Sequence, residues 1–286
     1  MYVRYEDVSQ DGRLGARPST HAIGAAIWRG VLDAHPMASA LMAQGILPIL
    51  SRLVVCGGGG PISVRARTWG EGAFQLVEVI DEAGRSRFRM DMCAELSSIR
   101  SRTFEPMPAP EDEQTITLGA VWAEHVLTRP FAPPSERAVD QLPEGLDLAG
   151  RAAFAPPWRS VSLPEGAQWV DADWVVDPTP LALGLGHTDS NQHVNSLVYP
   201  QLLEDAALRR LAALRRPFDR YVSRFEMAYR KPSFAGDCLR LRVRLYERGL
   251  ADGRTVTGLA GVFATDAEHA STLEKARVFG TVELEP

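Results

Sequence analysis

The sequence predicts an α+β chain made of two copies of one unit, in which a long helix is followed by four antiparallel strands. The elements expected in residues 2–94 recur in the same order in residues 168–283, at an offset of about 170–177 residues. In each copy, apolar residues with a helical period precede four runs that are typical of strands. Between the copies lies a stretch with ten of the chain's 20 prolines. Together these observations favour an internal duplication.

The first copy begins with a short strand at residues 2–6 and continues with a helix. Ser19 or Thr20 opens this helix, because a hydroxyl side chain satisfies free N–H groups at a helix start. The apolar face of the helix carries Ile23, Ala26, Ile27, Val31 and Ala34. Strand-like runs follow at residues 46–55, 62–69, 74–80 and 86–94. Residues 81–85 predict the turn of a hairpin, since Gly84 adopts positive φ easily.

The middle of the chain predicts a connector. Proline removes a backbone donor and disfavours helical conformation in the preceding residue, so this stretch cannot form one regular element. A short amphipathic piece at residues 118–127 interrupts it. We therefore expect an N-terminal unit at residues 1–102, degenerate in sequence, a proline-rich connector at residues 103–166, and a C-terminal unit at residues 167–286.

The second copy begins with an alternating strand at residues 168–176. A polar turn leads to a helix with a period close to 3.6 residues, carrying Val194, Leu197, Val198, Leu203, Ala206, Ala207, Leu211 and Leu214. Strand-like runs follow at residues 221–229, 238–247, 255–264 and 276–283. The long helix against an antiparallel sheet makes a two-layer unit.

Composition excludes several classes of protein. The formal net charge of -5 argues against bulk electrostatic binding of nucleic acid. No apolar run approaches the roughly 18–20 residues that a membrane span needs, and the first residues do not resemble an export signal. Cys56, Cys93 and Cys238 form neither a disulfide framework nor a zinc cluster. We expect a cytoplasmic protein with no membrane or nucleic-acid partner.

The polar segment Gly186–Tyr199 before the second helix is the most informative part of the chain. It places a carboxylate (Asp189), a carboxamide (Asn191) and an imidazole (His193) at alternate positions. The carboxylate could activate water or attack directly, while the free N–H groups of the helix could hold an oxyanion. The alternative is that Asp189 or Ser190 only caps the helix. Spacing alone leaves both interpretations open.

This segment resembles the hotdog-fold thioesterases, and most of all the acyl-ACP thioesterases with the motif D-x-N-x-H-V-N-N-x-x-Y. The match runs through Asp189-x-Asn191-x-His193-Val194-Asn195, then Tyr199 and Leu203-Glu204-Asp205-Ala206, and the resemblance covers about residues 169–283. The first copy resembles a hotdog unit only in the order of its elements. The resemblance implies a tandem (double) hotdog, in which a curved antiparallel sheet wraps each helix and the two units pair within one chain.

The resemblance also implies an active site at the interface of the two units, with Asp189, Asn191 and His193 as the catalytic positions. It departs from the plant-type enzymes at Tyr229-Arg230-Lys231-Pro232-Ser233, where those enzymes have Y-R-R-E-C. This removes their acidic residue and leaves a simpler scheme with one carboxylate. Expected substrate-binding residues are His21, Ile23, Ile27, Val194, Val198, Tyr199, Arg230 and Lys231.

The local excess of arginine in residues 209–248 suits a phosphopantetheine arm, a CoA phosphate or an acidic carrier protein. Alternate solvent-facing strand positions explain Arg240, Arg242 and Arg244 equally well, so only Arg230 and Lys231 are taken as functional. The run Gly57–Gly60 lacks the GK[ST] of a phosphate loop and is interpreted as a flexible link.

Three functions follow as expectations. The first is an acyl thioesterase acting on acyl-ACP or acyl-CoA, with no metal or redox cofactor, as a monomer with internal pairing or a homodimer. The second is a dehydratase or acyltransferase of a polyketide or fatty-acid pathway, for which His21 and Asp189 would be the acid–base pair. The third is a non-catalytic module that binds an acyl carrier. Fold alone does not separate them.

Overall fold

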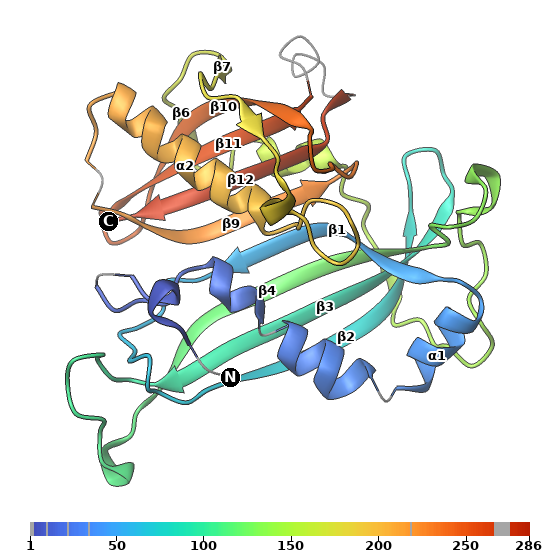
Figure 1. Ribbon diagram of the computed structural model, residues 1–286, viewed down its shortest axis with the longest axis horizontal. Helices are drawn as coiled ribbons and strands as arrows, with labels where there is room; N and C mark the ends of the chain where they lie inside the picture. The colour runs from blue at the N-terminus through green and yellow to red at the C-terminus, as the bar shows by residue number, and fades with distance from the viewer. Residues whose placement is uncertain (1–2, 10, 22, 34, 218, 266–274) are drawn as a thin grey trace. The chain divides into compact units, whose positions relative to one another are not determined.

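The computed structural model describes residues 3–9, 11–21, 23–33, 35–217, 219–265 and 275–286 (Figure 1). The chain forms two compact units, Met1–Ala155 and Pro156–Pro286, and each is described by itself. Tyr2 and Ala34, which the sequence places in a strand and a helix, lie outside the described residues. No helix among the described residues is long and apolar enough to cross a membrane.

The first unit contains a sheet with the strand order β5-β2-β3-β4-β1. Its neighbouring strands are antiparallel, except that β5 runs parallel to β2. The hairpin between β2 and β3 is closed by Asp81, whose Oδ1 accepts the N–H groups of Ala83 and Arg85 at 2.9 Å. The strands are β1 (Leu47–Cys56), β2 (Thr68–Ile80), β3 (Ser86–Ile99), β4 (Thr115–Thr128) and β5 (Gly150–Ala152).

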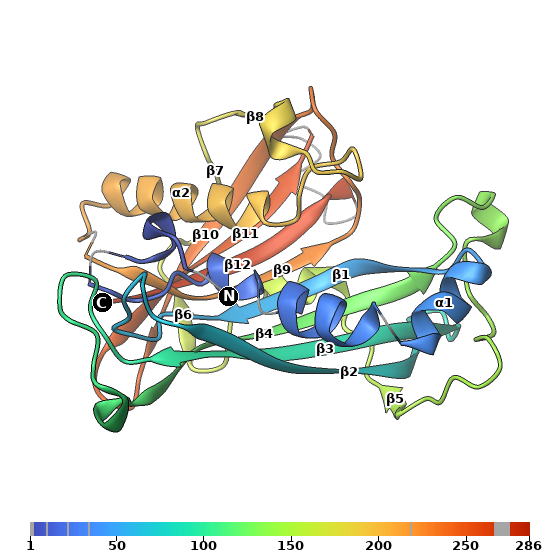
Figure 2. The same ribbon diagram turned by 60° about the horizontal axis from the view of Figure 1, so that its bottom comes forward.

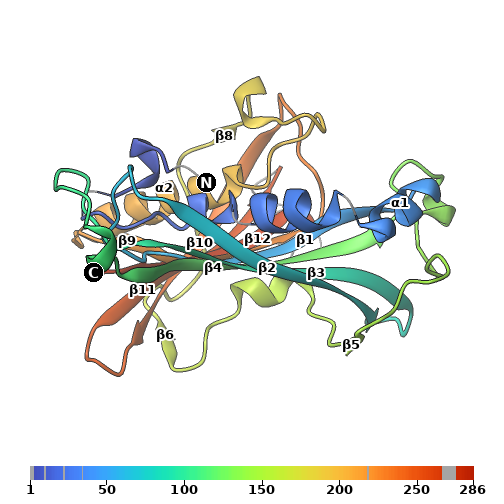
Figure 3. The same ribbon diagram turned by 90° about the horizontal axis from the view of Figure 1, so that it is seen from below.

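Helices cover one face of this sheet. The main one, η3 (Ile23–Leu32), is a wide helix of the π type and is followed by α1 (Pro36–Ala43). Ile27 of η3 is fully buried, and a Cβ at Gly72 of β2 would lie 2.9 Å from its Cγ1, so helix and sheet approach closely there. Figures 2 and 3 show both helices on the same side of β2 and β3.

The second unit repeats this plan. The helix α2 (Val198–Ala213) lies across a sheet with the strand order β9-β12-β11-β10-β6. Leu203 of α2 is fully buried, and a Cβ at Gly261 of β11 would lie 2.4 Å from its Cδ1. The strands are β6 (Ala167–Trp169), β7 (Val175–Val176), β8 (Leu181–Ala182), β9 (Tyr221–Tyr229), β10 (Cys238–Gly249), β11 (Thr255–Ala264) and β12 (Val278–Glu285), with β7 and β8 also paired to β10.

The two units share one strand order, which confirms the predicted duplication. The first sheet runs β2-β3-β4-β1 and the second β10-β11-β12-β9, so the strand that follows the helix ends up beside the last strand in both. Short helical turns complete the chain: η1 (Tyr5–Asp7), η2 (Arg17–Thr20), η4 (Pro110–Asp112), η5 (Pro134–Glu136), η6 (Pro157–Val161) and η7 (Leu185–His187).

Several elements differ from the sequence-based expectation. The start of the chain forms the turn η1 instead of a strand among its described residues. The run at residues 62–69 becomes a strand only from Thr68, because Ser63 closes a turn by accepting the N–H of Ala66 at 2.9 Å. The run at residues 168–176 divides into β6 and β7, since Asp171 lies between them and accepts the N–H of Leu245.

The largest difference concerns the expected connector. Residues 115–128 form β4, a full strand of the first sheet, so this unit extends to Ala155. Val121, Ala123 and Leu127 turn towards the helices and are buried, whereas Ala120 and Trp122 are exposed on the other side. That alternation is the period of a strand, which the surrounding prolines obscure in the sequence.

Candidate active site

The residues of the D-x-N-x-H motif lie in a closed loop between η7 and α2. Two main-chain hydrogen bonds close the loop. The N–H of Asp189 donates to the carbonyl of His193 at 3.1 Å, and the N–H of Gln192 donates to the carbonyl of Asp189 at 3.0 Å. Thr188 and Val194 form an isolated bridge at its base. Gln192 has a φ of 65°, a left-handed conformation that lets five residues turn back on themselves. Asp189, Asn191 and His193 are thus held within one turn.

Two donors orient the carboxylate of Asp189, which is half-buried. Its Oδ1 accepts the N–H of Asn191 at 2.9 Å, and its Oδ2 lies 3.4 Å from the Nδ2 of Asn195. Hydrogen bonds to both oxygens favour one rotamer of the side chain. The group is therefore presented as an oriented carboxylate.

Asn195 connects this carboxylate to the start of α2. Besides its contact with Asp189, its Oδ1 accepts the N–H of Leu197 at 2.8 Å and its carbonyl accepts that of Val198 at 3.0 Å. Its own N–H donates to the carbonyl of His187 at 2.8 Å. One residue thereby ties η7, the loop and α2 together.

The sheet holds the loop from below through β9 and the residues after it. The N–H of Val194 donates to the carbonyl of Ser233 at 2.8 Å, and the hydroxyl of Tyr229 donates to that of Ser196 at 2.9 Å. Burial raises the pKa of Tyr229 well above its usual range, so its hydroxyl stays protonated and remains a donor. Tyr199 packs edge-on against Tyr229, with ring centroids 6.0 Å apart.

His193 and Asn191 differ in their surroundings. The His193 ring is half-buried and meets Phe234 edge-on at 6.2 Å, whereas Asn191 is exposed. Within the described part of the chain, the main-chain N–H groups of Ser190 and His193 donate to no protein acceptor. These two donors face no competing partner inside the loop.

The helix begins later than the sequence predicts. The periodic residues suggest a helix from about Val194, with Asp189 beside its first turn, but α2 begins at Val198 and its N-cap is Leu197. The expectation that free N–H groups of the helix end lie next to Asp189 is wrong, because Asn195 redirects the chain before the helix starts. Pro200 is the third helical residue, where no intrahelical donor is needed, so it does not interrupt the helix.

The expected substrate-binding residues fall into two groups. Val194 and Tyr199 are buried at the loop and Val198 is half-buried, while Arg230 and Lys231 are exposed where β9 ends. The N–H groups of both basic residues donate to the carbonyl of Arg277 at 2.8 and 3.1 Å. The second group belongs to the first unit: His21 is exposed after η2, and Ile23 and Ile27 are buried beneath η3. That the two groups of residues line one pocket remains a prediction.

Sequence reasoning missed four residues that shape the site. Asn195 stood in the quoted motif, but its role in holding Asp189 has no signal in residue spacing. Tyr229, Ser233 and Phe234 contact the loop because the fold brings the end of β9 next to it. Their only signal in the sequence is that they lie at or just after the end of the strand that follows the motif-bearing helix. No cluster of His, Cys, Asp and Glu suited to a metal occurs among the residues that the structure describes.

Comparison with known proteins finds similarity in fold, but none in sequence. No protein-family model matches the chain, and no curated protein matches its sequence. Among solved structures, an acyl-ACP thioesterase from Bacteroides thetaiotaomicron superposes with a TM-score of 0.57 at 15% identity, covering 100% of this chain and 96% of that one. The 12:0-ACP thioesterase from Umbellularia californica gives 0.54 at 12% identity, covering 100% and 92%.

The chain has the double-hotdog fold. Both similar structures are matched over nearly their full length, so both units of the chain, and not only the motif-bearing one, take part in the likeness. The α+β class and the tandem organisation that the sequence predicts are confirmed. At such low identities the likeness concerns the fold, and the reaction has to be argued from the site.

Proposed function

We propose that this double-hotdog chain hydrolyses an acyl thioester to the free acid and the thiol, with Asp189 as its catalytic carboxylate. One observation carries the proposal: Asp189 is half-buried and held by two donors, in a loop with Asn191 and His193 directly before α2. A residue that merely closed a turn would need only the Asn191 contact. The second donor, Asn195, supports a carboxylate whose direction matters.

In the proposed reaction, the carboxylate of Asp189 takes a proton from water while the water oxygen attacks the thioester carbonyl carbon. The tetrahedral intermediate then collapses, the carbon–sulfur bond breaks, and the leaving thiolate receives the proton from Asp189. Direct attack by Asp189 would form an anhydride that water then hydrolyses, with the same products. In both routes one carboxylate is sufficient.

The negative charge that develops on the carbonyl oxygen needs donors. The N–H groups of Ser190 and His193 are available in the loop, and they replace the helix end that the sequence suggested. The exposed carboxamide of Asn191 and the half-buried imidazole of His193 are placed to orient water or the acyl group. We assign them that role.

We propose acyl-ACP or acyl-CoA as the substrate, in fatty-acid or polyketide biosynthesis. Arg230 and Lys231 present two positive charges beside the end of β9, which suits a phosphopantetheine or CoA phosphate. The three cysteines are free, which agrees with a reducing, cytoplasmic setting.

The direct test is to incubate the purified chain with panels of acyl-CoA and acyl-ACP of different chain lengths while following free thiol and free acid. Hydrolysis predicts one thiol and one acid for each thioester consumed. A dehydratase would change the acyl group of a 3-hydroxyacyl thioester without releasing thiol, and a binding module would change nothing. Either of these results would overturn the proposal.

A further inference from the structure

The turn between β9 and β10, residues 230–237, contacts the candidate loop at two points. The Phe234 ring meets the His193 imidazole edge-on, with ring centroids 6.2 Å apart. The carbonyl of Ser233 accepts the N–H of Val194 at 2.8 Å. Phe234 is 48% exposed, so burial alone does not fix its ring. The place of Phe234 beside His193 therefore depends on how the turn itself is held.

An ion pair holds this turn closed. The Oδ2 of Asp237 accepts hydrogen bonds from the N–H of Phe234 and from the Nη1 of Arg277, each at 3.0 Å. The same Nη1 donates to the carbonyl of Pro232, and the N–H of Asp237 donates to the carbonyl of Phe234 at 3.1 Å. The Arg277 and Asp237 side chains are only 22% and 26% exposed, which limits screening by solvent. A single carboxylate oxygen thus fixes the main chain of Phe234.

Arg277 ties the turn to the sheet. It directly precedes β12, and its N–H donates to the carbonyl of Phe263 in β11 at 2.8 Å. Its own carbonyl accepts the N–H groups of Arg230 and Lys231 at the start of the turn. Arg277 therefore holds the start of the turn with its main chain and the end of the turn, through Asp237, with its side chain.

The end of the turn also holds the segment that leads into η7. The N–H of Leu183 donates to the carbonyl of Asp237 at 2.9 Å, and the N–H of Gly236 donates to the carbonyl of Leu183 at 2.7 Å. Because η7 begins two residues later, at Leu185, the same turn supports the chain both before and within the candidate loop.

The first unit repeats this main-chain pattern. There, the N–H of Leu14 donates to the carbonyl of Gly59 at 3.0 Å, and the N–H of Gly58 donates to the carbonyl of Leu14 at 3.1 Å. Gly58 and Gly236 occupy equivalent places, and both have a positive φ, of 81° and 92°. Gly59 therefore stands where the second unit has Asp237, and it has no side chain that could pair with an arginine.

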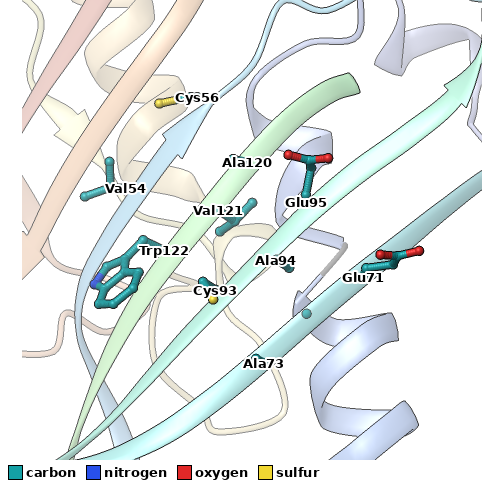
Figure 4. Close-up of a pocket in the computed structure, with 11 residues that line it drawn as sticks. Val54, Cys56, Glu71, Ala73, Cys93, Ala94, Glu95, Ala120, Val121 and Trp122 are labelled. Atoms are coloured by element: carbon teal, nitrogen blue, oxygen red, sulfur yellow. The ribbon is translucent and has the colours of Figure 1, made fainter. Parts of the chain in front are cut away.

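The first unit thus forms the same turn without a charged or aromatic side chain. Residues 57–60 are four glycines, which directly follow Cys56, the last residue of β1. Figure 4 shows Cys56 at an apolar groove of about 420 Å³, which Trp122 also lines. All residues that line this groove belong to β1, β2, β3 and β4, so the glycines add no side chain there either. The fold therefore does not require the Asp237–Arg277 pair, which occurs in the unit that carries the polar motif.

We propose that Asp237 and Arg277 are positioning residues for the reaction: they fix Phe234, and its ring fixes the imidazole of His193 towards the thioester. This inference rests on the hydrolysis proposed above and extends it to a turn outside the D-x-N-x-H loop. With its ring held edge-on, His193 loses rotamer freedom when the chain folds rather than when the substrate binds. Less of the reaction barrier is then due to orienting the imidazole.

Asp237→Asn tests the ion pair in the purified chain. Asparagine retains an oxygen for the N–H of Phe234 but loses the charge that attracts Arg277. We expect kcat to fall by about tenfold with little change in KM, because the acyl group still binds. Asp252→Asn is the matched control, since Asp252 closes the β10–β11 turn by accepting hydrogen bonds from the N–H and the Nε of Arg254, at 3.0 and 2.7 Å. Equal kcat values in the two variants would contradict the proposal.

Phe234→Leu shows whether the ion pair acts through the aromatic ring. Alone, it should lower kcat about as much as Asp237→Asn does. In the double variant, the second change should cost less than about twofold, because the ring that the ion pair positions is already gone. Melting temperatures check that each variant is folded. Losses that multiply in the double variant would show that the ion pair does not act through Phe234, and would overturn this role.

The ring signals of His193 test the same contact without turnover. In proton–carbon NMR spectra, the imidazole signal of His193, identified with His193→Gln, should shift in Phe234→Leu because the ring current of Phe234 is lost. Asp237→Asn should shift the signal as well, and Asp252→Asn should leave it in place. An unmoved signal in Asp237→Asn would overturn the positioning role even where kcat falls. A wild-type chain that releases no thiol from any acyl thioester would instead overturn the hydrolysis, and this role with it.

Discussion

Asn195 uses every polar group it has at the proposed site. Its side chain contacts the Asp189 carboxylate and the Leu197 N–H, and its main chain bonds to His187 and Val198. A residue with this many partners couples the direction of the carboxylate to the position of α2. We therefore treat Asn195 as a positioning residue for Asp189.

Asn195→Ala is expected to lower kcat by about tenfold to a hundredfold with little change in KM, because the carboxylate loses its orientation but the acyl group still binds. Asn195→Asp keeps the acceptor for Leu197 and places a second carboxylate beside Asp189. Since neighbouring carboxylates resist joint ionisation, the acidic limb of its pH–rate profile should move to higher pH. An unchanged profile together with unchanged kcat would leave Asn195 with a purely structural role.

His125 of β4 is a second residue whose surroundings have a measurable consequence. It is buried under η3, edge-on to Trp28 with ring centroids 5.7 Å apart. Burial lowers its pKa to about 4 from the usual 6.5. Between about pH 4 and pH 6.5, the His125 imidazole is therefore mostly neutral in the folded chain and mostly protonated in the unfolded chain.

Stability should consequently fall as the pH drops from about 6.5 towards 4, because the unfolded state binds the proton first. Between pH 7.5 and pH 5 this group alone is expected to remove about 2 kcal/mol from the free energy of unfolding. Urea unfolding at the two pH values measures it. His125→Leu should show a correspondingly smaller difference, and equal differences in the two proteins would refute the assignment.

At the scale of elements, α2 carries the site only because the sheet lets it approach closely. Gly261 of β11 leaves room for Leu203, and a Cβ there would overlap the Leu203 side chain at 2.4 Å. Leu203 belongs to the helix that follows the candidate loop, and Gly261 lies in the strand beneath it. The absence of a side chain at Gly261 thus allows α2 to pack close to β11.

Gly261→Ala is expected to lower the free energy of unfolding by about 1–3 kcal/mol through overpacking. Leu203→Ala alone should lose about 2–5 kcal/mol, because it leaves a cavity. In the double variant the new methyl group partly fills that cavity, so its loss should be smaller than the sum of the two. Additive losses, measured by chemical unfolding, would show that the two residues do not share the contact.

Elements with a clear period were predictable, and those fixed by distant contacts were not. β9 and β11 have the bounds that alternation indicates, and the helix–sheet order of both copies follows from periodicity. β4 was hidden by flanking prolines, and the late start of α2 depends on the hydrogen bonds of Asn195. The motif located the candidate loop, but the closed turn of Asp189–His193 required the structure.

At the scale of the whole molecule, duplication has left two units with one topology and different surfaces. Only the second carries the polar motif, whereas the first contributes η3 with the apolar residues Ile23 and Ile27. We predict that apolar residues of both copies contact the acyl chain, Ile23 and Ile27 from the first and Val194 and Val198 from the second. The two helices would then limit its length together.

Substituting tryptophan for Ala26 of η3, or for Val198 of α2, should shift the preferred substrate towards shorter acyl chains, because the added volume fills the pocket. Leu208→Trp is the control, since Leu208 is 37% exposed on the same helix α2. Chain-length profiles of the three variants measure the effect. If neither pocket variant moved the preference while remaining folded, the proposed pocket would be wrong.

The central claim is that the carboxylate of Asp189 drives thioester hydrolysis, and Asp189→Asn tests it most directly. Asparagine still accepts the N–H of Asn191, so the melting temperature should barely change. Turnover of the best acyl thioester should nevertheless fall by about 10²–10⁴-fold, the scale for loss of a general base. Asp205→Asn, an exposed change on α2, should retain full activity. A stable Asp189→Asn protein with near-normal turnover would contradict the account.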